Sequence, residues 1–228
     1  MSAAERWLAD TLGYACADAG LLTDALTHRS LGGPNNERLE FLGDAVLSFI
    51  VAELLYREFP GADEGALSRY RASMVSGEVL GTIALDLGLG NHVRLGEGEL
   101  KSGGFRRKSI LADALEALIG AIYLDGGIEA VRPVAERLFR GRLTELPEAG
   151  QLKDPKTRLQ ERLQGQGRPL PAYAVTASWG EPHDQTFRVS CEVASLGIAA
   201  EAEGSSRRRA EQEAARRVLE KIETGEHT

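Results

Sequence analysis

The chain has 228 residues, of which 43% are hydrophobic, so its length allows one large domain or two small ones with a packed core. The formal net charge of −7 belongs entirely to residues 1–152, because residues 153–228 hold equal numbers of acidic and basic side chains. Net charge therefore does not exclude a nucleic-acid partner here. The absence of a run of about 18 apolar residues predicts no membrane-spanning helix, and the N-terminus lacks the basic region of a signal peptide.

In chain order, apolar residues that recur near every 3.6 positions predict a helical first part. The predicted helices cover residues 4–18, 21–27, 37–57, 64–73, 77–87, 109–124 and 128–143. The glycine-rich stretch 88–104 predicts a loop. No convincing alternating strand pattern occurs before residue 143.

The pattern changes after a linker. Residues 144–156 lose apolar periodicity and contain two prolines and a glycine. Asp154 followed by Pro155 predicts a helix start. Three alternating segments then predict strands at 173–179, 185–193 and 196–203, before a last helix at 206–222. We therefore expect a helical domain at 1–146, a linker at 147–153 and a small α-β-β-β-α domain at 154–224.

The cysteines and histidines give little sign of a structural site. Cys16 and Cys191 fall in different predicted domains, which fits a reducing, cytoplasmic environment. No paired Cys or His spacing predicts zinc. His28 ends a predicted helix, and we interpret it as a structural hydrogen-bonding residue.

Acidic residues form a stripe on the predicted helix 37–57. Glu37, Glu40 and Asp44 occupy positions i, i+3 and i+7, which lie on one side of a helix. The remaining directions are almost all apolar, so the helix is predicted to be buried. Buried carboxylates are unfavourable unless they are paired or bind a metal.

The predicted helix 109–124 repeats the pattern with Asp113 and Glu116. We expect the two stripes to face each other, with raised carboxylate pKa values unless a cation neutralises them. Oxygen ligands of this kind select Mg²⁺ or Mn²⁺. The alternative is that the acids are solvated or form internal ion pairs.

Short motifs carry a resemblance to a known family. Residues 36–44, Asn-Glu-Arg-Leu-Glu-Phe-Leu-Gly-Asp, resemble the signature segment of bacterial ribonuclease III. Segments 26–30, 64–69, 101–104 and 109–117 also match that family's pattern, in order. The C-terminal part resembles its double-stranded-RNA-binding domain. The resemblance implies an all-α helical nuclease domain followed by a small α+β domain that binds double-stranded RNA.

The resemblance also implies a reaction and its site. The family hydrolyses double-stranded RNA with divalent metal, leaves 5′-phosphate and 3′-hydroxyl ends, and processes ribosomal and other structured precursor RNAs. It implies that Glu40, Asp44, Asp113 and Glu116 bind Mg²⁺, with Mn²⁺ as a substitute. Among these four, Asp44 and Glu116 are the candidate catalytic residues. Glu37 and Glu64 match accessory acidic positions.

The family's nuclease domain is a homodimer. The apolar face around Phe41 would then pack against the partner chain, and the alternative is that Phe41 belongs to the core of its own chain. The sequence also fits two competing functions. One is a binding protein with a degenerate nuclease domain, although all four central acids are present. The other is a helical metalloenzyme of small diphosphates, which the RNA-binding resemblance disfavours.

Three regions of the second domain are candidate contacts to A-form RNA, which proteins recognise by shape, 2′-hydroxyls and phosphates. The helix 156–164 and the turn at residues 180–183, between the first two predicted strands, would enter minor grooves. The arginines that begin the last helix would contact phosphates. The candidate residues are Thr157, Gln160, Glu161, Gln164, Pro182, His183, Arg207, Arg208 and Arg209.

The arginine run has an alternative as a solvated face balanced by Glu211 and Glu213. Cations at a helix N-terminus oppose the helix dipole, however, so an anionic partner would explain their position. A second basic run, Arg106, Arg107 and Lys108, would either contact RNA or offset neighbouring acids.

Overall fold

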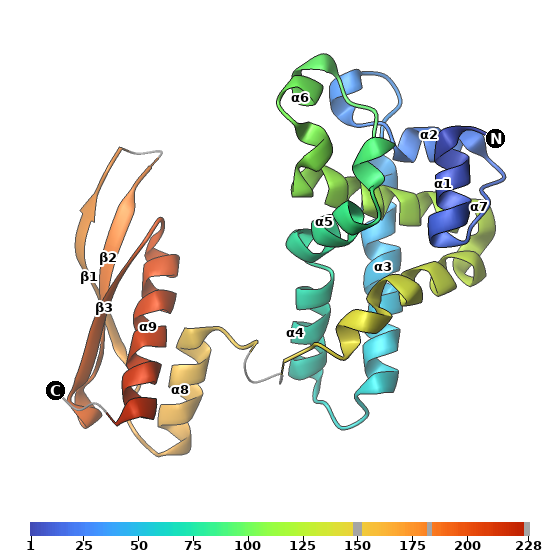
Figure 1. The fold of residues 1–228 in the computed structure, drawn as a ribbon. Coiled ribbons are helices and arrows are strands. Elements are labelled where there is room, and N and C mark those ends of the chain that lie inside the picture. The colour runs from blue at the N-terminus through green and yellow to red at the C-terminus, as the bar shows by residue number, and fades with distance from the viewer. Residues whose placement is uncertain (148–151, 182–183, 226–228) are drawn as a thin grey trace. The chain divides into compact units, whose positions relative to one another are not determined.

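The computed structural model describes residues 1–147, 152–181 and 184–225 (Figure 1). Its contacts divide the chain into two compact units, Met1–Ala149 and Gly150–Thr228. Most of the predicted linker 147–153 lies outside the described residues, so its exact bounds stay a prediction. No helix in the described ranges is long and apolar enough to cross a membrane.

The first unit is helical (Figure 1). Its helices are α1 (Ala3–Leu12), α2 (Ala19–Ala25), α3 (Glu37–Glu58), α4 (Glu64–Met74), α5 (Gly77–Asp86), α6 (Glu97–Lys101) and α7 (Lys108–Leu143). Short 3-10 turns lie at Arg29–Leu31, Leu89–Asn91 and Gly104–Arg106. The predicted loop 88–104 was therefore wrong in part, since α6 and these turns give it local structure.

Two glycines explain where the predicted helix limits hold and fail. The predicted helix 4–18 is too long, because Gly13 adopts a left-handed conformation with φ 65° and ends α1. Gly127, with φ 72° and ψ −171°, interrupts α7 at the predicted gap between 124 and 128. The long helix is therefore two helices joined at one glycine.

Helices α3, α5 and α7 build the core of this unit. Leu47 and Ile50 of α3, and Leu115 and Leu118 of α7, are almost completely buried. The α3–α7 contact places the predicted acidic stripes next to each other.

The prediction that α3 is buried nearly all round was wrong. Phe41, Phe49 and Tyr56 are 82%, 55% and 72% exposed. The reason is that α7 packs along one side of α3, and these three side chains lie where the described residues leave α3 uncovered. Phe41 therefore does not belong to the core of its own chain.

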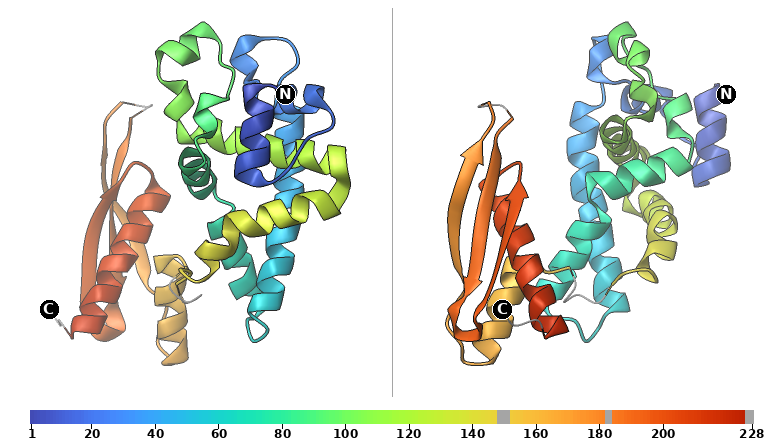
Figure 2. Two further views of the ribbon diagram at one scale, coloured as in Figure 1. Left: turned by 45° about the vertical axis from the view of Figure 1, so that its right-hand side comes forward. Right: turned by 60° about the vertical axis from the view of Figure 1, so that its left-hand side comes forward.

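The second unit has the predicted α-β-β-β-α order. Its elements are α8 (Pro155–Gly165), β1 (Ala172–Trp179), β2 (Thr186–Val193), β3 (Ile198–Gly204) and α9 (Arg207–Thr224). The strands form an antiparallel sheet in the order β1-β2-β3. Helices α8 and α9 pack together on one face of this sheet (Figure 2).

The start of α8 is as predicted. The Asp154 side chain accepts a hydrogen bond from the Thr157 backbone N–H at 3.1 Å, and Pro155 follows as the first helical residue. The second unit has its own hydrophobic core, which lies between the two helices and the sheet. It consists of Leu159, Leu163, Cys191, Val193, Ile198, Ala202, Ala214, Ala215, Val218 and Leu219.

Candidate active site

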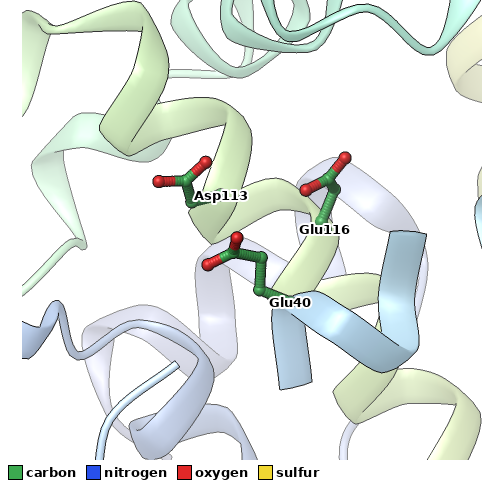
Figure 3. A group of neighbouring side chains, drawn as sticks. All are labelled: Glu40, Asp113 and Glu116. Carbon is green, nitrogen blue, oxygen red and sulfur yellow. The ribbon is translucent and has the colours of Figure 1, made fainter. Parts of the chain in front are cut away.

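Three carboxylates meet where α3 packs against α7. Glu40 comes from the first turn of α3, and Asp113 and Glu116 come from α7 (Figure 3). One carboxylate oxygen from each lies within 4.8 Å of those from the other two. We name these three residues the acidic cluster. Each is partly buried, which is less than the full burial expected from the sequence.

Burial and mutual repulsion raise the pKa values of the acidic cluster. Burial, followed by repulsion from Asp44, Glu40 and Asp113, raises the pKa of Glu116 to about 8. Burial and then Asp113 also raise the pKa of Glu40, and burial raises that of Asp113. The three carboxylates therefore repel one another, as we expected from the sequence for an acidic site without a cation.

The remaining predicted acids lie outside this cluster. Asp44 is exposed and does not share the 4.8 Å grouping, but its charge contributes to the raised pKa of Glu116. Glu37 is exposed and pairs with Arg29 at 3.4 Å. Glu64 begins α4, which follows the C-terminal end of α3, whereas Glu40 lies in the first turn of α3. A helix of 22 residues is about 33 Å long. Glu64 accepts a hydrogen bond from the Ser68 hydroxyl.

The 3-10 turn before α3 adds a cationic residue that helix periodicity could not place. The charge of Arg29 opposes the rise in pKa of both Glu40 and Asp113. His28 Nδ1 accepts a hydrogen bond from the Ser30 backbone N–H at 3.2 Å and caps the 3-10 turn. This geometry agrees with the structural role predicted for His28. The sequence pointed to Arg29 only through segment 26–30, which matches the family's pattern. That match did not predict that Arg29 lies near the acids.

The polar side chains of α8 that were predicted to bind RNA are exposed, but two have partners. Thr157 donates from its hydroxyl to Asp154 at 2.7 Å, and Glu161 pairs with Lys153 at 2.5 Å. The side chains of Gln160 and Gln164 are exposed and make no hydrogen bond among the described residues. Pro182 and His183 lie outside the described residues.

The three arginines at the start of α9 differ. Arg207 donates to Glu211 at 2.8 Å, and Arg209 donates to the Ser205 hydroxyl at 3.1 Å. Arg208 is exposed and has no ion pair or hydrogen bond within the described part of the chain. The predicted balance by Glu211 therefore holds for Arg207 and leaves Arg208 available for an anion.

Two family models match the chain. Residues 18–142 match the model described as ribonuclease-III-like, and residues 155–222 match the double-stranded RNA binding motif. The chain belongs to the ribonuclease III family. Its nuclease domain carries the acidic cluster, and its second domain is the double-stranded-RNA-binding domain.

Curated relatives match this chain over nearly its whole length. Ribonuclease 3 of Alkalilimnicola ehrlichii is 56% identical over 95% of both chains. Ribonuclease 3 of Vibrio cholerae is 53% identical over 96% of this chain and 97% of its own. Among solved structures, the ribonuclease III nuclease domain of Campylobacter jejuni is 41% identical, with a TM-score of 0.60. That match covers 64% of this chain and all of the other.

The family also bears on the two competing functions. A binding protein with a degenerate nuclease domain should lack at least one of the four central acids. This chain has all of them, namely Glu40, Asp44, Asp113 and Glu116. An enzyme of small diphosphates has no use for the double-stranded RNA binding motif at 155–222.

The second basic run agrees with the charge-offset alternative. Arg107 pairs with Glu99 at 2.9 Å, and Lys108 pairs with Glu78. Arg106 lies 5.2 Å from the centre of the Phe105 ring. Arg107 and Lys108 are thus already paired with acids of their own chain.

Proposed function

We propose that this ribonuclease III-type endoribonuclease hydrolyses double-stranded RNA at a Mg²⁺ site formed by Glu40, Asp44, Asp113 and Glu116. Mn²⁺ is the expected substitute. The observation that carries the proposal is the meeting of Glu40, Asp113 and Glu116 within 4.8 Å of one another. Asp44 completes the set because its charge acts on the same carboxylates.

The donor set fits a hard divalent cation. All of its ligands are carboxylate oxygens, which Mg²⁺ and Mn²⁺ prefer over soft metals. The raised pKa of Glu116, caused first by burial and then by neighbouring acids, is the electrostatic sign of an uncompensated site. Because a ligand must be deprotonated, binding of a cation would release protons from this cluster.

The chain's own residues divide the work between the two domains. When bound, the divalent cation supplies a Lewis acid for the scissile phosphate and an activated water. The acidic cluster would hold the cation in place from two helices, α3 and α7. Gln160, Gln164 and Thr157 face the minor groove, and Arg208 and Arg209 contact phosphates, so the second domain holds the duplex by its shape. The products are 5′-phosphate and 3′-hydroxyl ends.

The nuclease domain acts as a homodimer in this proposal. Phe41 projects from α3 at the edge of a groove of about 960 Å³, whose lining includes Leu21, Leu42 and Leu124. A second solved Campylobacter jejuni nuclease domain, 44% identical with a TM-score of 0.58, is described by its flexibility in a region involved in dimer formation. An exposed aromatic residue in a groove that is lined by leucines and rimmed by polar residues is typical of a surface that a partner covers. The expected setting is the cytoplasm, with ribosomal and other structured precursor RNAs as substrates.

The experiment that tests the site is Glu116→Ala with a perfect RNA duplex. We expect cleavage in Mg²⁺ to fall by about 100-fold or more, as for loss of one preorganised charge-stabilising group. Duplex binding in EDTA should stay at the wild-type level, because the second domain is untouched. Glu58→Ala, at the exposed C-terminal end of α3, is the matched control. Near-normal cleavage by Glu116→Ala at ordinary Mg²⁺ would show that the acidic cluster is not the metal site.

A further inference from the structure

Helices α3 and α7 cross at two glycines, Gly43 and Gly120. A Cβ atom placed on Gly43 would lie 1.7 Å from the backbone carbonyl oxygen of Glu116. A Cβ atom placed on Gly120 would lie 2.3 Å from the carbonyl oxygen of Leu39. Both obstacles are backbone atoms, so no side-chain rotation could make room for a methyl group. Only glycine permits this approach of the two helices.

The crossing is the part of the helices that carries the acidic cluster. Glu116 presents its carbonyl oxygen to Gly43 and its carboxylate to Glu40. Leu39, whose carbonyl oxygen meets Gly120, directly precedes Glu40 in α3. One helical turn separates each glycine from an acid of the cluster. The separation of the helices at the glycines therefore sets the distance between the carboxylates.

We propose that Gly43 and Gly120 are positioning residues for the metal site. Their missing side chains let α3 and α7 approach until Glu40 reaches Asp113 and Glu116. Neither glycine touches the cation or the RNA. The proposal rests on the proposed function, because it assumes that the acidic cluster binds the cation.

Close packing at a glycine is not by itself a sign of a metal site, because Gly81 also lets α5 approach α7 away from the acidic cluster. The crossing at Gly43 and Gly120 differs because it brings together three carboxylates whose oxygens lie within 4.8 Å of one another. Close approach increases the repulsion among these carboxylates. Charge alone would thus favour a wider crossing, whereas a cation held between the helices favours the narrow one.

The test is Gly120→Ala, followed by titration with Mn²⁺ while the free ion is measured by electron paramagnetic resonance. We expect Mn²⁺ affinity to fall by about tenfold or more, the size of effect seen when groups that orient metal ligands are changed. Cleavage should then need a higher Mg²⁺ concentration and recover when Mg²⁺ is raised. Duplex binding in EDTA should not change.

Two further glycines of the same domain are matched controls. A Cβ on Gly81 of α5 would lie 2.6 Å from the carbonyl oxygen of Lys108, so Gly81→Ala creates a comparable clash with α7 away from Glu40. A Cβ on Gly141 of α7 would meet nothing within 4 Å. We expect Gly81→Ala to lower the melting temperature but keep wild-type Mn²⁺ affinity. Gly141→Ala should keep that affinity too, without lowering the melting temperature.

Each other outcome overturns the proposal. A folded Gly120→Ala protein with wild-type Mn²⁺ affinity would do so, as would an equal loss of affinity in Gly81→Ala. If Gly120→Ala lacks helical circular dichroism, the titration is repeated in trimethylamine N-oxide, which favours the compact state. A protein still unfolded there would mean that the glycine serves folding and not the site. Failure of the proposed function is distinguishable, because Glu116→Gln would then bind Mn²⁺ like the wild type.

Discussion

Lys156 on α8 donates a hydrogen bond from its Nζ to Glu211 Oε2 on α9 at 2.5 Å. Arg207 donates to the other carboxylate oxygen at 2.8 Å. The bond from Lys156, helped by that from Arg207, holds the pKa of Glu211 below its ordinary value. Glu211 thus joins the two helices of the RNA-binding domain, and it is buried.

We predict that Glu211→Gln destabilises the RNA-binding domain by about 1–3 kcal/mol at pH 7, because two charged donors lose their carboxylate. A lowered folded-state pKa contributes stability above the unfolded value, and this stability is lost as pH falls through the folded value. The difference from the wild type should therefore shrink as pH falls below about 4.3, the ordinary glutamate pKa. Urea unfolding of the wild type and the variant at several pH values measures it. A difference that does not depend on pH would contradict the ion pair.

Glu116→Gln should stabilise the metal-free protein. Burial and three neighbouring acids raise the pKa of Glu116 to about 8, so its contribution to stability is present at low pH and is lost as pH rises through that value. Removing the charge should raise the melting temperature in EDTA at pH 8 by about 5 °C, with little change at pH 4. Thermal unfolding monitored by circular dichroism checks this.

The same variant tests the cation. Mg²⁺ should raise the melting temperature of the wild type, because binding to the folded state alone stabilises it. It should raise that of Glu116→Gln much less. Equal Mg²⁺ shifts in the two proteins would remove Glu116 from the ligand set.

Much of the fold could be predicted because its signals are local. The acids at positions 40, 113 and 116 stand at helical spacing in apolar segments, so their meeting followed from two amphipathic patterns. The cap at Asp154 and the alternating strands were equally local. Gly127 marked the break in α7 through the gap in periodicity.

The rest depended on tertiary contacts that periodicity does not encode. The same apolar pattern describes a side of α3 that α7 covers and a side that the described residues leave open, so periodicity alone could not decide between the two alternatives for Phe41. Arg29 approaches the acids from a loop whose path the sequence does not reveal. The sequence offered Glu211 as a partner for the arginine run, but which arginine it pairs with depended on side-chain packing at the start of α9.

We predict that Phe41→Ser makes the nuclease domain monomeric. Phe41 is 82% exposed in one chain, and burying such a side chain against a partner contributes about 1.5–3 kcal/mol to association in each protomer. Sedimentation velocity of wild type and variant at equal concentration measures the change. Leu100→Ser on α6 is the control, because Leu100 is also exposed and lies on a different helix. A dimeric Phe41→Ser protein would move the interface elsewhere.

The arginines at the start of α9 should separate into two kinds. Arg208 has no partner among the described residues, so Arg208→Ala should remove one phosphate contact and leave stability unchanged. The slope of log affinity against log salt should fall by about one unit, and binding should weaken equally for duplexes of any sequence. Arg207 is bonded to Glu211, so Arg207→Ala should lower the stability of the domain and change the salt slope less. Salt titrations of duplex binding, with unfolding curves for both variants, distinguish the two. An unchanged slope for Arg208→Ala would mean that Arg208 is a solvated residue, and an unchanged stability for Arg207→Ala would mean that its ion pair contributes nothing.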